Sequence, residues 1–524
     1  MNPSMPRLLR AVLLGTALAA QSLPAATFDL QTATVEDINK AFDAGALTSE
    51  KLVGLYLARI AAYDKQGPNI NAIITLQPNA LEIARALDKE RKEKGPRSPL
   101  HGIPVVLKDL YDTKDLPTSA GFLPLKNSQP LYDATVVKRL RDAGAIILAK
   151  VNMSDWFGVP KKGDQSTVLG RTSNPYNLDL TPGGSSGGTG ASLAAAFAQL
   201  GLGSETGVSI RNPTSNNSIV GLAPTRGLIP RAGQVMTSFT QERCGPMARS
   251  VYDVAAMTSI VAGFDAEDLL TISTPGNMPD VPYTQFLKKD GLKGARIGVF
   301  RDLFRRGPLH AEGTALVEKA IAQMKAEGAI VVEGVTLGID VFDLLDTHGG
   351  MRTNYHEAQF SYDLYFRRLG PNAVIKNMDE LNALGELVKP SIRKAYAEFR
   401  SLDHHADFLA RRDMQESLRT AIVEVMDKYK LDALVHPFKS VPPEGHMDRG
   451  AEKDNPVSSV TGLPAVLVPA GYTAKENGPI AIEFLGRPYA EPVLFRLAYA
   501  YEQISHNRKV PPTTPALPGE HFDY

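Results

Sequence analysis

Short apolar runs alternate with segments of helical periodicity along most of the chain, and this alternation is typical of an α/β protein. Thr48 and Ser49 are suited to capping a helix whose apolar residues recur on one face. A second helix is predicted from Leu81 to the charged run that ends before Gly95. The apolar stripe of the first helix consists of Leu52, Leu55, Leu57, Ile60 and Ala61.

Two of the apolar runs, IPVVLK (residues 103–108) and AIILAK (145–150), are apolar on both faces. Such runs are typical of buried strands in a sheet that helices cover. The segment between them, DATVVKRLRDAGA (133–145), has the periodicity of a helix. These three segments therefore predict a βαβ unit.

The second half of the chain follows the same rhythm, with strands predicted at residues 296–300, near Ile330 and near Val435. Residues 352–430 are almost wholly helical in pattern and rich in Tyr, Phe and charge, which predicts a helical insertion over one edge of the sheet, roughly at 341–430. No linker rich in Pro and Ser divides the chain. We therefore expect one large α/β domain over residues 27–524, with a mixed β-sheet covered by helices.

The composition is that of an ordinary globular protein and narrows the range of partners. The chain has 524 residues, of which 43% are hydrophobic and 22% charged. Lys and Arg number 57, and Asp and Glu also number 57, so the chain has no net positive charge that would attract phosphate groups. The sequence therefore predicts no nucleic-acid partner. The single cysteine, Cys244, cannot form an intrachain disulfide or a cysteine-rich metal cluster.

The first 26 residues have the features of a secretory signal peptide. They contain Arg7 and Arg10 but no acidic residue, and they continue with the apolar run AVLLGTALAAQSL and small residues up to Ala26. Gln21, Ser22 and Pro24 interrupt this run well before the length of about 20 residues that a membrane-spanning helix needs. The expected location is periplasmic or secreted, without stable membrane insertion once residues 1–26 are removed.

Two groups of residues resemble metal sites but are incomplete. His356-Glu357 begins the H-E-x-x-H pattern of zinc proteases, but Phe360 occupies the position of the second histidine. The adjacent His404 and His405 with Asp407 (HHAD, 404–407) lie in a charged helical segment, where such residues are more often a solvated face than a ligand set. The sequence predicts no metal.

Nucleotide-binding and β-lactamase patterns also fail. The glycines of GLGSETG (201–207) miss the G-x-G-x-x-G spacing by one residue, and the glycine run at 183 lacks the Gly-Lys-Ser/Thr of a phosphate loop. Ser391 and Lys394 satisfy S-x-x-K, but neither S-D-N nor K-T-G occurs, so this pair is interpreted as part of a surface helix. No organic cofactor is expected.

The segment from Thr181 to Pro213 contains two serine centres. Its run GGSSGG (183–188) is followed at once by an apolar helical segment, and glycines beside the free N–H groups of a helix N-terminus favour a reacting site over a flexible linker. Gly183, Ser185 and Gly187 also satisfy the G-x-S-x-G elbow of α/β-hydrolases. That motif needs a hydrophobic strand before it, which NPYNLDLTP does not provide, and the sequence alone cannot place the candidate histidines, His436 and His446.

The chain resembles the amidase signature family in a series of motifs that follow the family's order. The resemblance covers most of the chain after residue 26 and is strongest between residues 102 and 255. The motifs are GIPVVLKD (102–109), RTSNPYN (171–177), GGSSGG (183–188), GSETGVSIRNP (203–213), VGLAPTRGLIPRAG (220–233), GPMARSVYDVA (245–255), GLPAVLVPAG (462–471) and IEFLGRP (482–488).

The resemblance implies the amidase signature fold and a Ser–cis-Ser–Lys triad. By motif position, Ser209 is the nucleophile, Ser185 the bridging serine after a cis peptide at Gly184, and Lys108 the base. A serine hydroxyl needs a base to remove its proton during attack, and a lysine can be that base only when it is neutral. A second hydroxyl can donate and accept at once and can therefore relay the proton.

The oxyanion of a tetrahedral intermediate needs hydrogen-bond donors, and backbone N–H groups just before the nucleophile are suited to provide them. The candidates are Thr206, Gly207, Val208 and Ser209, with Ser185 also at the substrate site. The family pattern D-I-G-G-S reads E-T-G-V-S here. A β-branched residue tolerates positive φ badly, so either Val208 keeps φ negative or the donor geometry differs from that of relatives.

The expected function is that of an exported serine amidohydrolase, which cleaves small-molecule amides at the C–N bond through an acyl-Ser209 intermediate. Three alternatives stay open at this point: ester or carbamate cleavage, the glutaminase component of a tRNA-dependent amidotransferase, and a catalytically silent binding protein of the same fold. The aromatic side chains of residues 351–368 belong either to an acyl pocket or to the core of the insertion. The sequence leaves the substrate and the oligomeric state open.

Overall fold

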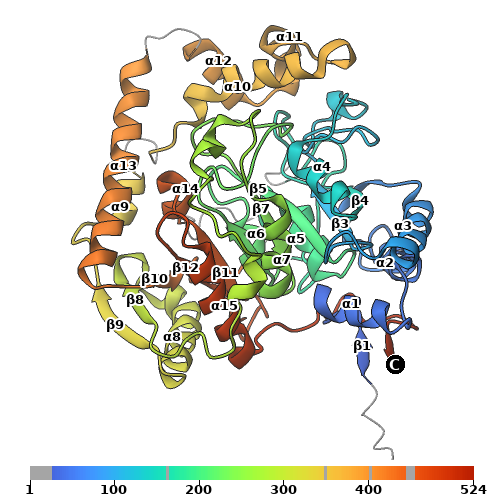
Figure 1. The fold of residues 1–524 in the computed structure, drawn as a ribbon. Coiled ribbons are helices and arrows are strands. Elements are labelled where there is room, and N and C mark those ends of the chain that lie inside the picture. The colour runs from blue at the N-terminus through green and yellow to red at the C-terminus, as the bar shows by residue number, and fades with distance from the viewer. Residues whose placement is uncertain (1–25, 161–164, 347–350, 400–403, 444–454) are drawn as a thin grey trace, which may run out of the picture.

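One mixed β-sheet forms the centre of the computed structural model, which describes residues 26–160, 165–346, 351–399, 404–443 and 455–524 (Figure 1). Within these residues the sheet has eleven strands in the order β2-β4-β3-β5-β7-β6-β11-β12-β10-β8-β9. The strands, in that order, are Ile73–Leu76, Ile146–Val151, Pro104–Lys108, Leu200–Glu205, Arg243–Ala248, Val220–Ala223, Ala465–Tyr472, Pro479–Leu485, Ala433–Pro437, Arg296–Phe300 and Ile330–Val335.

The sheet has two parallel parts that antiparallel strands join. Strand β3 pairs in parallel with β4 and β5, and β8 pairs in parallel with β9 and β10. Between these parts, β7, β6, β11 and β12 pair antiparallel with their neighbours. The crossover from β3 to β4 contains α4 (Thr135–Asp142), so the predicted βαβ unit and the mixed sheet are both confirmed.

Helices cover the sheet on both faces, as Figure 1 shows, and several begin and end where the sequence predicts. The Thr48 side chain accepts a hydrogen bond from the Lys51 N–H at the start of α2 (Ser49–Tyr63), and Gly95 ends α3. The other helices outside the insertion are α1 (Val35–Asp43), α3 (Ala80–Lys94), α5 (Gly187–Ala194), α6 (Arg211–Asn216), α7 (Val251–Val261), α8 (Ala311–Ala326), α14 (Val457–Thr461) and α15 (Glu491–Ser505).

Helix α5 packs closely against β5 and the end of β4 because glycines form the contact. A Cβ added at Gly201 of β5 would lie 2.7 Å from Cγ2 of Thr189 on α5. A Cβ added at Gly188 would lie only 2.2 Å from the carbonyl oxygen of Asn152, which follows β4. Gly201, from the incomplete dinucleotide pattern, and Gly188, from the run GGSSGG, therefore allow close helix–sheet packing at the N-terminal part of α5.

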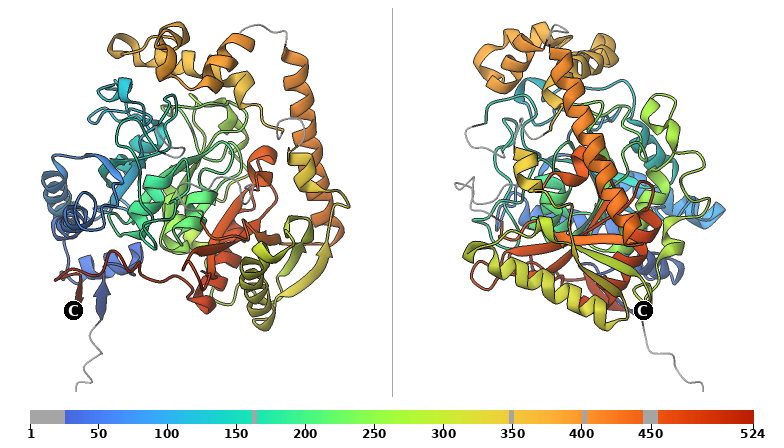
Figure 2. Two further views of the ribbon diagram at one scale, coloured as in Figure 1. Left: turned by 180° about the vertical axis from the view of Figure 1, so that it is seen from behind. Right: turned by 90° about the vertical axis from the view of Figure 1, so that its left-hand side faces the viewer.

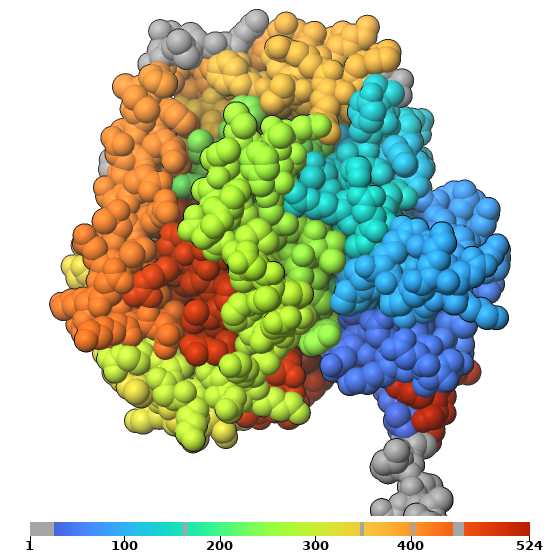
Figure 3. Space-filling model, viewed as in Figure 1, coloured from blue at the N-terminus to red at the C-terminus, as the bar shows by residue number. Residues whose placement is uncertain are grey.

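The helical insertion lies between β9 and β10 and consists of α9 (Val341–Asp346), α10 (Asn354–Leu369), α11 (Met378–Ala383), α12 (Pro390–Glu398) and α13 (His405–Lys428). Helix α13 covers the β8–β10 part of the sheet, where its Leu418 and Ile422 belong to one buried cluster with Phe300 and Leu434. Figure 2 shows α13 running past these strands, and Figure 3 shows the insertion in yellow and orange along one side and the top of the molecule. The insertion thus covers the part of the sheet near the β9 edge and continues over the top of the molecule as drawn in Figure 3.

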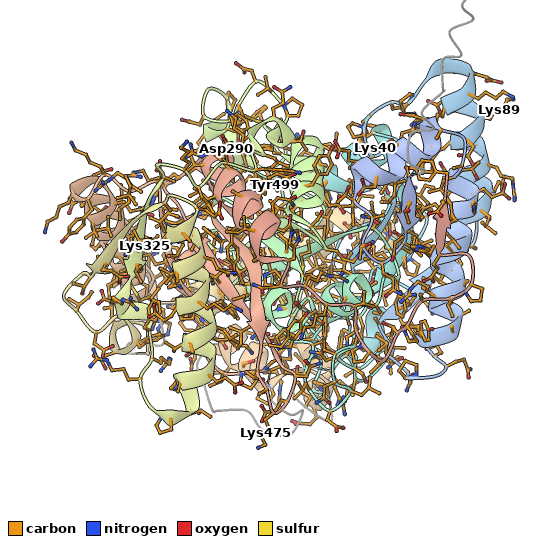
Figure 4. The ribbon with its side chains drawn as sticks, turned by 90° about the horizontal axis from the view of Figure 1, so that it is seen from below. Lys40, Lys89, Asp290, Lys325, Lys475 and Tyr499 are labelled. Atoms are coloured by element: carbon orange, nitrogen blue, oxygen red, sulfur yellow. The ribbon has the colours of Figure 1, made fainter. Side chains whose placement is uncertain are left out.

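The described termini lie together, on the side away from the insertion. Strand β1 (Thr27–Asp29) pairs antiparallel with β13 (His521–Asp523) in a separate two-stranded sheet. The lower face in Figure 4 presents charged side chains such as Lys40 on α1 and Lys325 on α8, and Lys40 pairs with Glu36 at 3.1 Å. The predicted signal peptide spans residues 1–26. All of it except Ala26 lies outside the described residues. Over the described residues, no helix has both the length and the apolar character that crossing a bilayer requires.

We expect Gly188→Ala to destabilise the protein, because the new Cβ would overlap the backbone of Asn152 and force α5 away from the sheet. Overpacking of this kind costs about 1–3 kcal/mol of unfolding free energy. Gly54→Ala is the matched control, since Gly54 lies in α2 with no atom within 4 Å of an added Cβ. Calorimetry should show a lower Tm for Gly188→Ala and an unchanged or higher Tm for Gly54→Ala. Equal Tm values for the two variants would contradict the close packing.

Candidate active site

Lys108 is the last residue of β3, and its side chain is fully buried. Its Nζ donates hydrogen bonds to Oγ of Ser185 at 2.7 Å and to Oγ of Ser204 at 2.9 Å. The ring of Trp156 lies 5.1 Å from the same nitrogen. Burial disfavours the charged amine and lowers the pKa of Lys108 to about 7, although the nearby carboxylates of Glu242 and Glu205 act in the opposite direction. A neutral amine is therefore accessible near neutral pH.

Ser185 lies in the loop that leads into α5, and its peptide bond with Gly184 is cis, as the resemblance implied. Gly183, one residue earlier, has a φ of 75°, and a Cβ there would lie 2.0 Å from Oδ1 of Asn212. The loop is also tied to β5, because the N–H of Ser204 donates to Oγ of Ser186 at 3.2 Å. These contacts hold the Ser185 hydroxyl at the end of β3.

The predicted nucleophile Ser209 lies in a loop whose two ends are held by one carboxylate. Glu205 ends β5, and its Oε2 accepts the backbone N–H groups of Ile210 and Arg211, each at 3.1 Å. These N–H groups belong to the start of α6, so Glu205 closes the loop of residues 206–209. The unusual Glu at this position thus has a structural role that the motif alone left open.

Buried charges surround Glu205 and stabilise it as a carboxylate. Arg211 Nε donates to Glu205 at 2.9 Å, and Arg243 donates to the same oxygen at 2.5 Å. Arg211 also pairs with Glu483 of β12 at 3.1 Å. Burial opposes the charged form of Glu205, but the charges of Arg211 and Arg243 outweigh it, and the pKa of Glu205 is lowered. The loop before Ser209 is therefore anchored to β7 and β12.

Residues 206–209 line a cavity, and their backbone N–H groups are the candidate donors for an oxyanion. Among the described residues, none of these four N–H groups donates a hydrogen bond. Val208 is absent from the residues with positive φ, so the loop keeps φ negative there. Its side chain instead packs at the edge of the buried cluster beneath α13. The valine therefore leaves the N–H groups available as donors.

The cavity has a volume of about 260 Å³. Ser185, Ser209 and residues 206–208 all line it. Residues of α10 and α12, with Arg352 and Lys389 shortly before them, also line it. The aromatic segment 351–368 has both of the roles considered for it, because Tyr355 and Tyr362 line the cavity while Phe366 packs on Phe157. The insertion residues that line the cavity are Arg352, Asn354, Tyr355, Ala358, Tyr362, Lys389, Ser391, Ile392 and Ala395.

The residues of the metal-like and β-lactamase-like patterns have other surroundings than Ser185 and Ser209. His356 Nε2 lies 2.8 Å from Asp407, and the described residues contain no group of three or more His, Cys, Asp or Glu side chains that could hold a metal. Ser391 and Lys394 lie on α12, and both are exposed, which agrees with their interpretation as part of a surface helix. Ser391 also borders the cavity.

The hydrolase elbow finds no support in the described residues. No strand occurs between residues 171 and 186, before the serine loop. His436 is buried on β10, where its Nε2 lies 3.9 Å from Glu483, and the side-chain partner of the Ser185 hydroxyl is Lys108. His446 lies outside the described residues.

Three residues at the site were missed by sequence reasoning. Ser204, the second acceptor of Lys108, lies within the motif GSETGVS, and the alternation of β5 was a signal that its side chain points to the face opposite to that of Glu205. Glu242, which accepts from Oγ1 of Thr206 at 2.5 Å, and Arg352 gave no local signal. Their place depends on the packing of distant segments.

Comparison with known proteins is consistent with this geometry. The profile of the Amidase family matches residues 51–495. A probable amidase of Arabidopsis thaliana is 35% identical over 520 residues, with 96% of each chain covered. The glutamyl-tRNA(Gln) amidotransferase chain of Symbiobacterium thermophilum is 33% identical over 506 residues, covering 91% of this chain and 97% of the relative.

Solved structures agree over the whole fold. The native peptide amidase from Stenotrophomonas maltophilia superimposes with a TM-score of 0.83 at 34% identity, covering 92% of this chain and 98% of that chain. An amidase family protein from Bacillus anthracis gives a TM-score of 0.81 at 33% identity, with 92% of each chain covered. The chain therefore belongs to the amidase signature family and is an amidase, a hydrolase that acts on amides.

Proposed function

We propose that the protein is an exported serine amidohydrolase that cleaves carboxylic amides at the C–N bond through an acyl-Ser209 intermediate. The observation that carries the proposal is the 2.7 Å hydrogen bond between a buried Lys108 and Ser185, beside a cavity that Ser209 shares. The four N–H groups of residues 206–209 without protein acceptors support it. No metal or organic cofactor takes part in the proposed reaction.

In the proposed reaction, Oγ of Ser209 attacks the amide carbonyl carbon. The Ser209 proton passes to Ser185 while the Ser185 proton passes to the neutral amine of Lys108. The electron pair of the C=O bond moves onto the oxygen, where the N–H groups of residues 206–209 stabilise it. The intermediate then collapses, the C–N bond breaks, and Lys108 returns the proton through Ser185 to the departing nitrogen.

The leaving group departs as ammonia or an amine, and Ser209 remains as an ester of the acyl group. Water attacks this ester with the same relay acting as base, and the carboxylic acid is released with Ser209 regenerated. Esters and carbamates present the same carbonyl carbon, so their cleavage is an alternative activity of this machinery. A catalytically silent binding protein, suggested by Val208 in place of the family's glycine, is the alternative outside catalysis. The absence of a positive φ at Val208 supports the enzyme over this alternative.

A second candidate function is the glutamine-hydrolysing role within a tRNA-dependent amidotransferase, which the relatives named as glutamyl-tRNA(Gln) amidotransferase chains suggest. The zero net charge and the features of residues 1–26 favour the exported amidase. Assays with primary amides, anilides, peptide amides, esters and free glutamine distinguish the alternatives. Exclusive turnover of glutamine would favour the second candidate.

Replacement of the nucleophile should abolish both hydrolysis and covalent capture. We expect Ser209→Ala to lower kcat/KM for amides by about 10⁴-fold or more, because the proposed acyl-enzyme forms on the Ser209 hydroxyl. A serine-directed phosphonofluoridate should label the wild type at Ser209, and mass spectrometry should find no adduct in Ser209→Ala. Ser273→Ala, at an exposed position, is the control and should be labelled like the wild type. Absence of an adduct in the folded wild type would refute the proposed nucleophile.

The activity should rise with pH through the pKa of Lys108, which burial lowers to about 7. Below that pH the amine is protonated and cannot accept the proton; above it the amine is free, so kcat/KM should rise and then level off. Lys108→Ala should lower kcat/KM by about 10²- to 10⁴-fold and remove this rising limb. A flat profile between about pH 5 and 9, with a solvent isotope effect showing that chemistry limits the rate, would contradict the role of Lys108.

Export depends in this proposal on residues 1–26. When the full chain is expressed in a Gram-negative host, we expect the active protein in the periplasm or medium, with a mature N-terminus near Thr27. Leu13→Asp combined with Leu14→Asp breaks the apolar run and should retain the uncleaved chain in the cytoplasm. N-terminal sequencing of fractionated cells measures both results. An intact Met1 in wild-type protein from the cytoplasm would overturn the export proposal.

A further inference from the structure

Arg352 stands immediately before α10, at the wall of the active-site cavity that faces the loop of residues 206–209. Its guanidinium lies against Gly207: the Cζ and Nη2 atoms are each 3.4 Å from the position that a Cβ on Gly207 would occupy. Arg352 and Tyr355 also border a second cavity of about 340 Å³ between α10, α12 and α13. The guanidinium therefore stands where the two cavities meet, beside the proposed oxyanion loop.

The backbone around Arg352 is held in place by buried amide side chains. Oε1 of Gln241 accepts both the N–H and the hydroxyl of Thr353, at 2.6 and 2.9 Å. The amide nitrogen of the same Gln241 donates to the carbonyl oxygen of Thr206 at 3.3 Å. On the other side, Nε2 of Gln415 donates to the carbonyl oxygen of Met351 at 2.6 Å. One glutamine thus connects the backbone beside Arg352 directly to the loop that leads to Ser209.

The other charged side chains of the active-site cavity have protein partners. Lys389 donates to the backbone carbonyl oxygen of Asp155. The carboxylate of Asp155 accepts backbone N–H groups of Phe157 at 3.0 Å and Thr167 at 2.8 Å. The negative charge of Asp155 is therefore held by N–H groups of its own segment and lies close to the Lys389 amine.

The charged groups of the second cavity are also paired with one another. Lys394 lies 3.6 Å from Glu398, and Arg411 lies 3.0 Å from Asp407, which also accepts from His356. Among the described residues, the side chain of Arg352 makes no hydrogen bond and no ion pair. The wall of the active site thus presents one positioned cation whose five N–H donors are unused by the protein.

An exposed arginine is most often simply solvated, and an isolated surface charge contributes little to stability. Arg352 differs from that case in its place, because it is fixed beside the reacting loop and partly enclosed by two cavities. A guanidinium matches a carboxylate with two parallel hydrogen bonds, which gives orientation as well as affinity. The Cα atoms of Gly207 and Ser209 are two residues apart, so the guanidinium lies within about 12 Å of the Ser209 Cα.

We propose that the substrate of this amidase carries a carboxylate close to the scissile amide and that Arg352 binds this carboxylate. The inference rests on the proposed amide hydrolysis and adds the substrate class. The distance limit places the carboxylate a few bonds from the reacting carbonyl. It belongs either to the acyl part, as in an ω-amic acid, or to the leaving amine, as in an N-acyl amino acid. In both cases Arg352 sets specificity by holding the part of the substrate that does not react.

Matched pairs of substrates test the proposal. Succinamate against butyramide probes a carboxylate on the acyl side, and N-acetylglycine against N-ethylacetamide probes one on the amine side. We expect kcat/KM for the charged member of one pair to exceed that of its neutral partner by about 10-fold or more, as a charge-assisted bidentate contact supports. Arg352→Gln should reduce this ratio to about one, and Arg352→Lys should give an intermediate ratio because the ammonium lacks the planar fork.

Arg367→Gln is the control, because Arg367 lies on α10 outside both cavities and should leave the ratio unchanged. A binding measurement separates recognition from chemistry: in Ser209→Ala, calorimetry should show that Arg352→Gln weakens binding of the charged amide by a similar factor. Hydrolysis of neutral amides with no preference for either charged amide, or a ratio that Arg352→Gln leaves unchanged, would overturn the role of Arg352 while the proposed amidase stands. Failure of the wild type to hydrolyse any amide, with no phosphonofluoridate adduct at Ser209, would overturn both.

Discussion

The site depends on one physical constraint: a lysine amine is buried at the end of a strand, where none of the described carboxylates forms an ion pair with it. Lys108 has two serine hydroxyls as its hydrogen-bond partners, and desolvation is the largest influence on its pKa. Burying an ammonium group without a paired charge is unfavourable, so the environment favours the neutral amine. The same burial that would make a structural lysine costly is what makes this lysine suitable as a base.

The rest of the scaffold keeps the hydroxyl groups in place around that amine. Glycines at 201 and 188 let α5 approach the sheet, and the loop that precedes α5 then places Ser185 next to Lys108. On the other side, Glu205 holds the start of α6, so the loop that contains Ser209 is closed at both ends. The buried Glu205–Arg211–Glu483 chain connects this loop to β12. Such fully paired buried charges position groups more than they add stability.

The insertion contributes about half of the residues that line the cavity, and the rest of the fold contributes the serines. The proposed reacting groups come from β3, from the loop before α5 and from the loop after β5, while α10 and α12 contribute other lining residues of the cavity. Gln241 connects these two parts by contacting both Thr206 and Thr353. The position of the insertion and that of the loop before Ser209 are therefore coupled through one buried glutamine.

Local pattern in the sequence was enough for the strands 104–108 and 146–151, the helices that flank them and the motifs around Ser185 and Ser209, because periodicity and capping act over a few residues. It was also enough to raise the question of Val208, but not to answer it. The negative φ of Val208, the role of Glu205, the contact of Ser204 with Lys108 and the position of Arg352 were decided only by the tertiary structure. Each depends on segments far apart in the chain, up to the pairing of Arg211 with Glu483, and no local pattern encodes such distances.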